Sequence, residues 1–131
     1  MRLKTAAILI ATCCGTAVAG PAGINGSWSG EMRQIEVNAE AKYPMTLTLA
    51  GSGGTTNYPT LNCSGSWTKI ATRSGYAIYE EKVTNTKGAT CIDGMVMVKL
   101  DSGKLILGWF AAYAGAPSLA AASLEKTTAA K

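Results

Sequence analysis

Carboxylates are the residues of this chain whose types could support catalysis. The sequence contains no histidine, which removes Ser-His and Cys-His nucleophile pairs and the commonest metal ligand. A glycosidase needs only two carboxylates, and the candidates for such a pair are Glu31, Glu36, Glu80, Glu81, Asp93 and Asp101. Glu80 and Glu81 are adjacent, so on a strand they would face opposite sides and could not pair with each other. We expect no enzymatic activity, no catalytic residue and no cofactor.

The cysteines predict one disulfide bond. Cys63 and Cys91 are the two of four cysteines that follow the N-terminal leader described below, and no C-x-x-C spacing is present to indicate a redox-active pair. In an oxidising compartment they are expected to pair, closing a loop of about 28 residues for a gain of roughly 3.5 kcal/mol. A pair so oxidised leaves no thiolate ligand for zinc, and we expect no metal site.

The N-terminal segment has the pattern of a secretory signal peptide. Arg2 and Lys4 precede an uncharged run, and residues 17–19 form the small-x-small sequence Ala-Val-Ala that signal peptidase reads. The chain is therefore expected to be exported, to the periplasm or the medium. Cys13 follows Ile-Ala-Thr, loosely like a lipoprotein signal, so a lipid anchor at Cys13 is the less favoured alternative.

The predicted domains are a signal peptide at 1–19, a single β-domain at 20–127 and a frayed C-terminal tail at 128–131. Removing 19 of the 131 residues leaves 112, which is the size of one domain. The leader holds two of the 12 Lys and Arg residues, which leaves ten against eight acidic residues, a net charge of +2. Such a weak charge excludes the clustered basic face of a nucleic-acid binder. No later stretch is long and apolar enough for a transmembrane segment, and we expect a monomer.

Alternating apolar and polar residues predict about eight short strands. The clearest is 43–49, YPMTLTL, where every second residue is Tyr, Met or Leu. The hairpin signal DSGK at 101–104 joins two further strands. The predicted strands are 26–32, 43–49, a short extended piece at 58–61, then 65–72, 76–84, 91–100, 105–113 and a final one near 119–126.

A single open sheet of this size would leave two edges exposed. The expected fold is therefore all-β, a small antiparallel up-and-down β-barrel of about eight strands with one disulfide. A two-layer β-sandwich is the alternative. The interior of an eight-stranded barrel is just wide enough for side chains or for one small ligand.

The segments YPTLNCSG, YEEKVT, CIDG and the later GW resemble the landmarks of a small β-domain family of bacterial secreted proteins. The resemblance covers about residues 24–127 and carries no known activity. It implies that Cys63 and Cys91 are the family's cysteine pair, that Glu81 is its strand glutamate and that Trp109 is its late aromatic. Lys69 departs from the pattern at a position where an apolar residue is expected.

Two further resemblances concern function. NGSWSG is similar to the G-x-W opening of lipocalin and avidin-like barrels, in which the tryptophan closes one barrel end. TRSGYAIYEEK is similar to the loop of the periplasmic and membrane-bound inhibitors of C-type lysozyme, although the tyrosine offset after Ser74 differs.

The direction of Glu81 is left open by alternation alone, because neither face of 76–84 is purely apolar. The family resemblance favours an inward Glu81, and a buried carboxylate needs a partner. Arg33 and Lys99 are the candidate partners. The three tryptophans, Trp28, Trp67 and Trp109, are expected in the core.

These features lead to three hypotheses for function. The first is a non-catalytic binding module for an extracytoplasmic protein or a cell-envelope glycan. The second is an inhibitor or immunity-type protein that acts on a lysozyme or another cell-wall hydrolase, and the third is a carrier of a small apolar ligand in the barrel mouth. The candidate binding residues are Tyr58, Arg73, Ser74, Tyr76, Tyr79 and Glu81.

Overall fold

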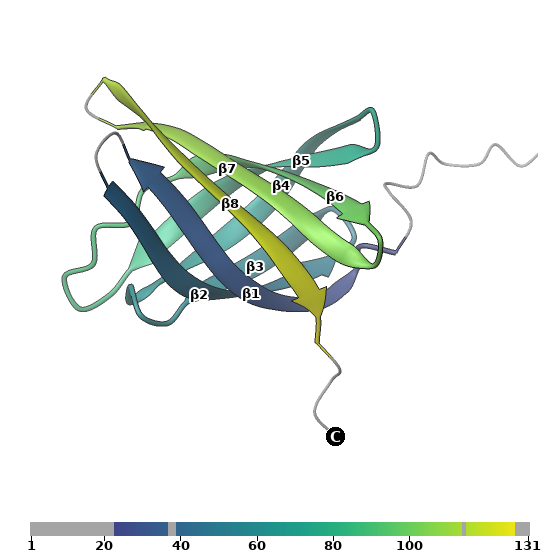
Figure 1. Cartoon of the computed structure of the whole chain (residues 1–131), viewed down its shortest axis with the longest axis horizontal. Coiled ribbons are helices and arrows are strands. Elements are labelled where there is room, and N and C mark those ends of the chain that lie inside the picture. Colours follow the sequence, from purple (N-terminus) through teal and green to yellow (C-terminus); the bar gives the residue numbers. More distant parts are fainter. Residues whose placement is uncertain (1–22, 37–38, 114, 128–131) are drawn as a thin grey trace, which may run out of the picture.

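Eight antiparallel strands close into a barrel in which each strand pairs with its sequence neighbours and the first pairs with the last (Figure 1). The structure is a computed structural model and describes residues 23–36, 39–113 and 115–127. The strands are β1 (Gly26–Glu36), β2 (Ala39–Ala50), β3 (Gly53–Tyr58), β4 (Cys63–Arg73), β5 (Tyr76–Asn85), β6 (Gly94–Asp101), β7 (Lys104–Tyr113) and β8 (Ala116–Lys126). The predicted barrel is confirmed, and the alternative of two packed sheets does not occur. The predicted leader 1–19, with Cys13, and the tail 128–131 lie outside the described residues.

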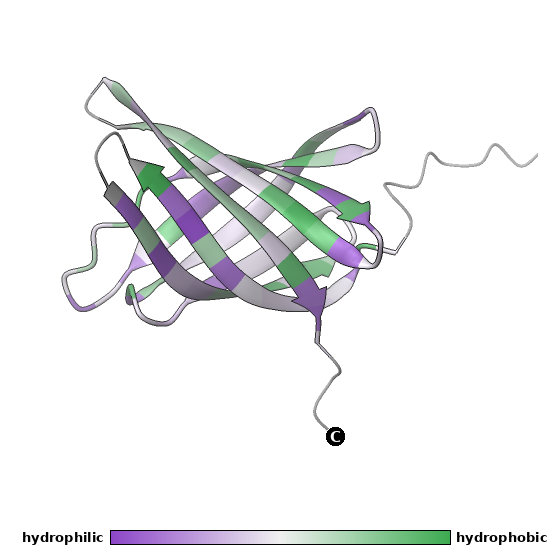
Figure 2. Cartoon of the chain, in the orientation of Figure 1, coloured by the Kyte–Doolittle hydropathy of each residue, from purple (hydrophilic) through white to green (hydrophobic). Residues whose placement is uncertain are grey.

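Alternation along each strand sorts the side chains between the interior and the outer face. In β2, Met45, Leu47 and Leu49 are buried, whereas the threonines between them are exposed. The same alternation of apolar and polar residues runs along most strands in Figure 2. Burial of the apolar face provides the main driving force for folding.

The third strand lies earlier in the chain than the sequence predicted. The structure places it at Gly53–Tyr58, and residues 59–62 form a turn in which Leu61 N donates to Tyr58 O at 3.0 Å. The prediction of an extended piece at 58–61 was therefore wrong. The segment GGTTNY has little apolar character of its own, and its extended form is completed by pairing with β2 and β4 on both sides.

A β-bulge in β4 resolves the question raised by Lys69. Lys69 pairs with Tyr79 and Ala71 pairs with Ile78, which leaves Ile70 as an extra residue on the outer surface. Lys69 does share the inward parity of Trp67, but it is only half-buried. The strand bends at a bulge of this kind, and residues 71–73 beyond it are exposed.

The two ends of the barrel differ. At the closed end, Trp28 is 1% exposed and its Nε1 donates to the carbonyl oxygen of Ile24 at 2.8 Å, so that the residues before β1 lie across this end. The Lys126 ammonium lies 5.7 Å from the centre of the Trp28 ring. The connections 59–62 and 86–93 lie at the opposite, open end. Of the described connections of the barrel, 86–93 is the longest.

Candidate functional site

Glu81 lies inside the barrel. It follows Ala77 and Tyr79 in the inward alternation of β5, and only 1% of its surface is exposed. The prediction that Glu81 points inward is confirmed. The three tryptophans predicted in the core, Trp28, Trp67 and Trp109, are also buried.

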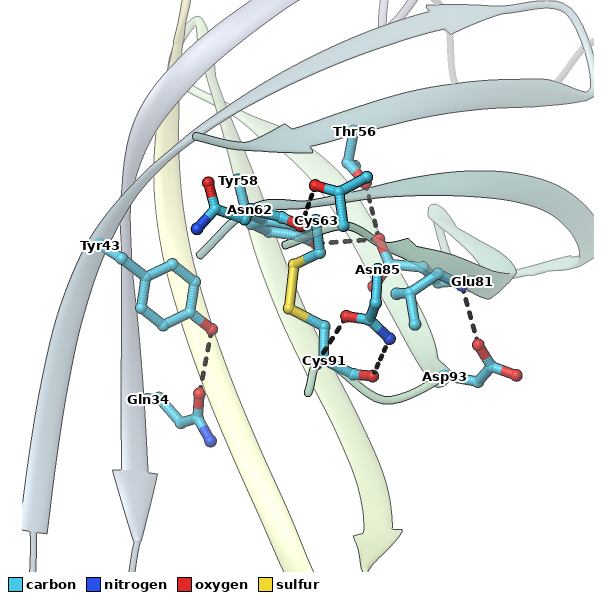
Figure 3. The surroundings of a disulfide bond; sticks show 12 residues. Gln34, Tyr43, Thr56, Tyr58, Asn62, Cys63, Glu81, Asn85, Cys91 and Asp93 are labelled. Atoms are coloured by element: carbon cyan, nitrogen blue, oxygen red, sulfur yellow. Dashed lines mark hydrogen bonds between the residues drawn. A yellow bond between two sulfur atoms is a disulfide. The ribbon is translucent and has the colours of Figure 1, made fainter. Parts of the chain in front are cut away.

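Four neutral donors converge on the Glu81 carboxylate. Its Oε2 accepts hydrogen bonds from Thr56 Oγ1 at 2.9 Å, Tyr58 OH at 2.8 Å and Trp67 Nε1 at 2.7 Å. Its Oε1 accepts one from Trp109 Nε1 at 3.1 Å. Figure 3 shows the hydrogen bond between Thr56 and Glu81 as a dashed line, with the disulfide to its left. Hydrogen bonds to a charged acceptor are stronger than neutral ones, and four of them offset much of the cost of burial.

The predicted partners of Glu81 were wrong. The Arg33 guanidinium pairs with Glu40 at 2.8 Å on the outer surface. The Lys99 ammonium lies 5.1 Å from the centre of the Tyr76 ring and is also outside. Both residues have outward parity in their strands, so neither can reach the interior.

Two glycines make room for this network. A Cβ atom at Gly65 would overlap Thr56 Oγ1 and the Glu81 carboxylate, and one at Gly94 would overlap the Trp109 indole nitrogen. Gly65 and Gly94 belong to β4 and β6, the two strands that flank Glu81 on β5. The carboxylate and the Trp109 indole occupy the space that side chains would otherwise fill.

Tyr58 remains a donor over the ordinary pH range. Burial, together with the negative charge of Glu81 and the hydrogen bond to it, raises the pKa of the Tyr58 phenol well above its ordinary value. The phenol therefore stays protonated and continues to donate to the carboxylate.

A cavity of about 640 Å³ occupies the open end of the barrel, with Glu81 among its lining residues. Three aromatic rings line it, from Tyr43, Tyr58 and Trp109. No described residue of β4 or β6 contributes to the lining. The other lining residues are Met32, Gln34, Thr60, Leu61, Val83, Gly88, Ala89, Thr90, Cys91, Ile92, Ala116, Pro117 and Ser118.

The disulfide holds one wall of the cavity in place. The predicted bond between Cys63 and Cys91 is present and ties the 86–93 connection to the start of β4 (Figure 3). The Asn85 side chain brackets Cys91, accepting from its backbone nitrogen at 2.9 Å and donating to its carbonyl oxygen at 3.0 Å. Asp93 Oδ1 accepts from the backbone nitrogen of Val83 at 2.8 Å. The longest connection is thus anchored at both ends.

Polar side chains line the opposite wall. Tyr43 OH donates to Gln34 Oε1 at 3.1 Å, and Gln34 Nε2 donates to Ser118 Oγ at 3.1 Å. The Tyr43 ring meets the Tyr58 ring edge-on, with centres 6.0 Å apart. This chain of contacts orients the two tyrosines before any ligand is present.

The six candidate binding residues do not form one surface. Tyr58 and Glu81 line the cavity, whereas Tyr79 is 0% exposed in the core. The other three, Arg73, Ser74 and Tyr76, lie at the β4–β5 turn, at the closed end. The candidates therefore fall into two groups, Tyr58 with Glu81 at the cavity and Arg73, Ser74 and Tyr76 at the turn, while Tyr79 belongs to neither.

Glu81 is the one carboxylate among the described residues that line the cavity. Its sequence neighbour Glu80 faces outward and lies 3.1 Å from the Lys82 ammonium. Within the described ranges there is no cluster of three or more His, Cys, Asp or Glu side chains that could hold a metal ion. The described lining of the cavity therefore supplies one carboxylate, whereas a glycosidase uses two.

Sequence reasoning missed Thr56, Gly65 and Gly94. Alternation could have placed the two glycines on the inner face. Gly65 lies two residues before the inward Trp67, and Gly94 lies two residues before the inward Val96. An inward glycine beside an inward carboxylate indicates that a neighbouring side chain occupies the space that a side chain at the glycine would fill.

Comparisons with protein-family models, with curated proteins and with solved structures found no match to the chain. Among the described residues there is no helix long and apolar enough to cross a membrane.

Proposed function

We propose that the protein is a non-catalytic binding protein that holds a small molecule in the mouth of its barrel. The observation that carries this proposal is the cavity of about 640 Å³ at the open end, with the Glu81 carboxylate among its lining residues. Ligand sites of proteins are commonly concave spaces of about 300–1,000 Å³ with apolar walls and a few oriented polar groups. This cavity matches that description.

The barrel is filled at one end only, which supports a ligand at the other. Trp28 and Ile24 cover the closed end, while Leu105 and Leu124 are fully buried in the interior. At the open end, Leu61, Ala89 and Ile92 are only partly buried and line the cavity. An eight-stranded barrel can hold one small ligand when part of its interior is left open in this way.

A partner protein or envelope glycan read by exposed tyrosines has less support. Tyr79 is inaccessible, and Tyr58 lies at the opposite end of the barrel from Tyr76. No single contact surface includes all three rings.

The test is a screen of the oxidised protein against a chemically diverse small-molecule library by thermal shift, followed by NMR. Bound compounds should raise the melting temperature by mass action and move the amide signals of Leu61 and Ile92, which line the cavity. Val83→Phe fills the mouth and should abolish binding. Thr84→Phe is the matched control, because Thr84 is the next residue of β5 and lies on the exposed outer face.

Two results would contradict the proposal. One is that no compound in the library stabilises the protein. The other is that compounds bind equally well to the Val83→Phe protein, which would place their site elsewhere.

We also propose that the protein acts outside the cytoplasm, which the Cys63–Cys91 bond supports because disulfides persist in oxidising compartments. The measurement is N-terminal sequencing of the protein recovered from a secreting host. A chain that begins at Gly20 is expected. An intact Met1 in the soluble cytoplasmic fraction would contradict export.

The inhibitor hypothesis is retained as a second candidate because of the β4–β5 hairpin. Ser74 and Gly75 form its tip with φ values of 53° and 81°, and Arg73 and Ser74 are exposed. Figure 1 shows this hairpin reaching past the neighbouring strands at the closed end. If the tip enters a hydrolase cleft, a double Arg73→Ala and Ser74→Ala change should abolish inhibition of lysozyme, whereas Val83→Phe should leave it intact.

A further inference from the structure

We propose that the ligand of the barrel mouth carries a protonated amine on an apolar body, and that Glu81 binds the amine. This inference rests on the proposed function, because it names the class of ligand that the same cavity takes.

The charge of the cavity favours a cation. Among the described residues that line it, Glu81 alone carries a formal charge, and none is Lys or Arg. The ion pairs recorded for the described residues all lie among exposed side chains, as in Lys82 with Glu80. A cation that enters meets one opposite charge that no cationic side chain of the lining balances, whereas an anion is repelled by it.

The hydrogen bonds of Glu81 leave one oxygen with spare capacity. Oε2 accepts three hydrogen bonds and Oε1 accepts one, from Trp109. A carboxylate oxygen offers about two lone-pair sites, so Oε1 can accept one more donor. All four present donors are neutral and none of them balances the charge. An ammonium group would supply both the missing hydrogen bond and the missing charge.

The walls fit the rest of such a ligand. Tyr43, Tyr58 and Trp109 present aromatic rings to the cavity, and aromatic faces attract cations by a further 0.5–2 kcal/mol, roughly, in desolvated sites. Leu61, in the 59–62 turn, and Ile92, in the 86–93 connection, add apolar surface to the lining. The cavity therefore combines a negative group with walls for an alkyl or aryl chain.

The experiment compares three probes of equal chain length by isothermal titration calorimetry with the oxidised protein at neutral pH. They are n-octylamine, which is protonated, 1-octanol, which is neutral, and octanoate, which is anionic. We expect the amine to bind at least about tenfold more tightly than the alcohol, because a charge-assisted hydrogen bond exceeds a neutral one by that order. Octanoate should bind more weakly than both.

Glu81→Gln removes the charge with little change of shape. It should lower the affinity for octylamine about tenfold, to near that for octanol. Glu80→Gln is the matched control, because Glu80 is the adjacent residue on the outer face of β5, and it should leave the order of the three probes unchanged. If the Glu81→Gln protein does not fold, the order measured with the unaltered protein still decides the proposal.

Two outcomes would overturn the proposal, and they are distinguishable. Octanol or octanoate binding as tightly as octylamine, in a manner lost in Val83→Phe, would reject the amine and leave a small-molecule function standing. Absence of binding by all three probes at about 1 mM would reject the amine, and the library screen would then decide the small-molecule function by itself.

Discussion

Glu81 shows how a small barrel can satisfy a buried carboxyl group with neutral donors from other strands. Its four donors come from three other strands, since Thr56 and Tyr58 belong to β3, Trp67 to β4 and Trp109 to β7. Each donor would be left without a partner if the carboxylate were removed, and a buried unsatisfied donor costs about 1–3 kcal/mol. We therefore expect the network to contribute to fold specificity as well as to the proposed binding of a ligand.

The first prediction concerns the space that the network needs. Gly65→Ala should lower the free energy of unfolding by about 1–3 kcal/mol, because the new Cβ overlaps Thr56 Oγ1 and the Glu81 carboxylate. Gly108→Ala is the control, since a Cβ at that strand position meets nothing within 4 Å. Urea denaturation measures the free energy of unfolding of both variants. Equal stability of the two variants would show that the network can move aside without cost.

The second prediction concerns alkaline pH. The pKa of Tyr58 is raised above its ordinary value of 10.0 in the folded protein by burial and by Glu81. Above about pH 10 the unfolded chain therefore loses this proton before the folded protein does, and stability falls as pH rises. Tyr58→Phe should make the fall shallower by up to about 1.4 kcal/mol per pH unit. An unchanged slope in Tyr58→Phe would contradict the assignment.

At the scale of the elements, the long connection between β5 and β6 is the part of the barrel that depends most on a covalent link. It is held by the Cys63–Cys91 bond, by two hydrogen bonds between the Asn85 side chain and the Cys91 backbone, and by a hydrogen bond that Asp93 accepts. Several of its residues, including Ala89 and Ile92, line the cavity. The disulfide therefore supports one wall of the cavity as much as the fold.

The third prediction follows from that placement. A double Cys63→Ser and Cys91→Ser change should lower the free energy of unfolding by about 3–4 kcal/mol, as the chain-entropy model gives for a separation of 28 residues. Hydrogen exchange should quicken most in 86–93, while the closed end stays protected. Uniform loss of protection along all eight strands would contradict the local role of the bond.

Alternation in the sequence predicted most of the elements because inward and outward residues differ clearly in strands such as β2. It failed for β3, where GGTTNY has no apolar stripe and depends on its neighbours. Parity alone left the direction of Glu81 open and the family resemblance favoured an inward side chain, but its partners depend on which strands lie across the barrel. Arg33 and Lys99 were chosen for charge, and strand parity places both outside. The cavity was unpredictable for the same reason, since it is bounded by residues distant in sequence.

For the whole molecule, stability and binding are expected to reside at opposite ends. Gly30 allows Leu124 of β8 to pack against β1, and Leu124 is fully buried. Leu61 lies at the mouth, where it is only partly buried and lines the cavity. We therefore expect the packed end to provide most of the stability of the barrel, so that the open end can contain a cavity.

The fourth prediction separates these two roles. Leu124→Ala should lower the free energy of unfolding by about 2–5 kcal/mol, as other buried leucines do when truncated, but leave the affinity for octylamine nearly unchanged once folding is complete. Leu61→Ala should do the reverse, weakening octylamine binding several-fold while costing less than about 1 kcal/mol of stability. Urea denaturation and calorimetry on the same two proteins provide the comparison. If Leu124→Ala reduced octylamine affinity as much as Leu61→Ala, the two ends would be coupled, and the mouth could not be regarded as a site carried by an independent scaffold.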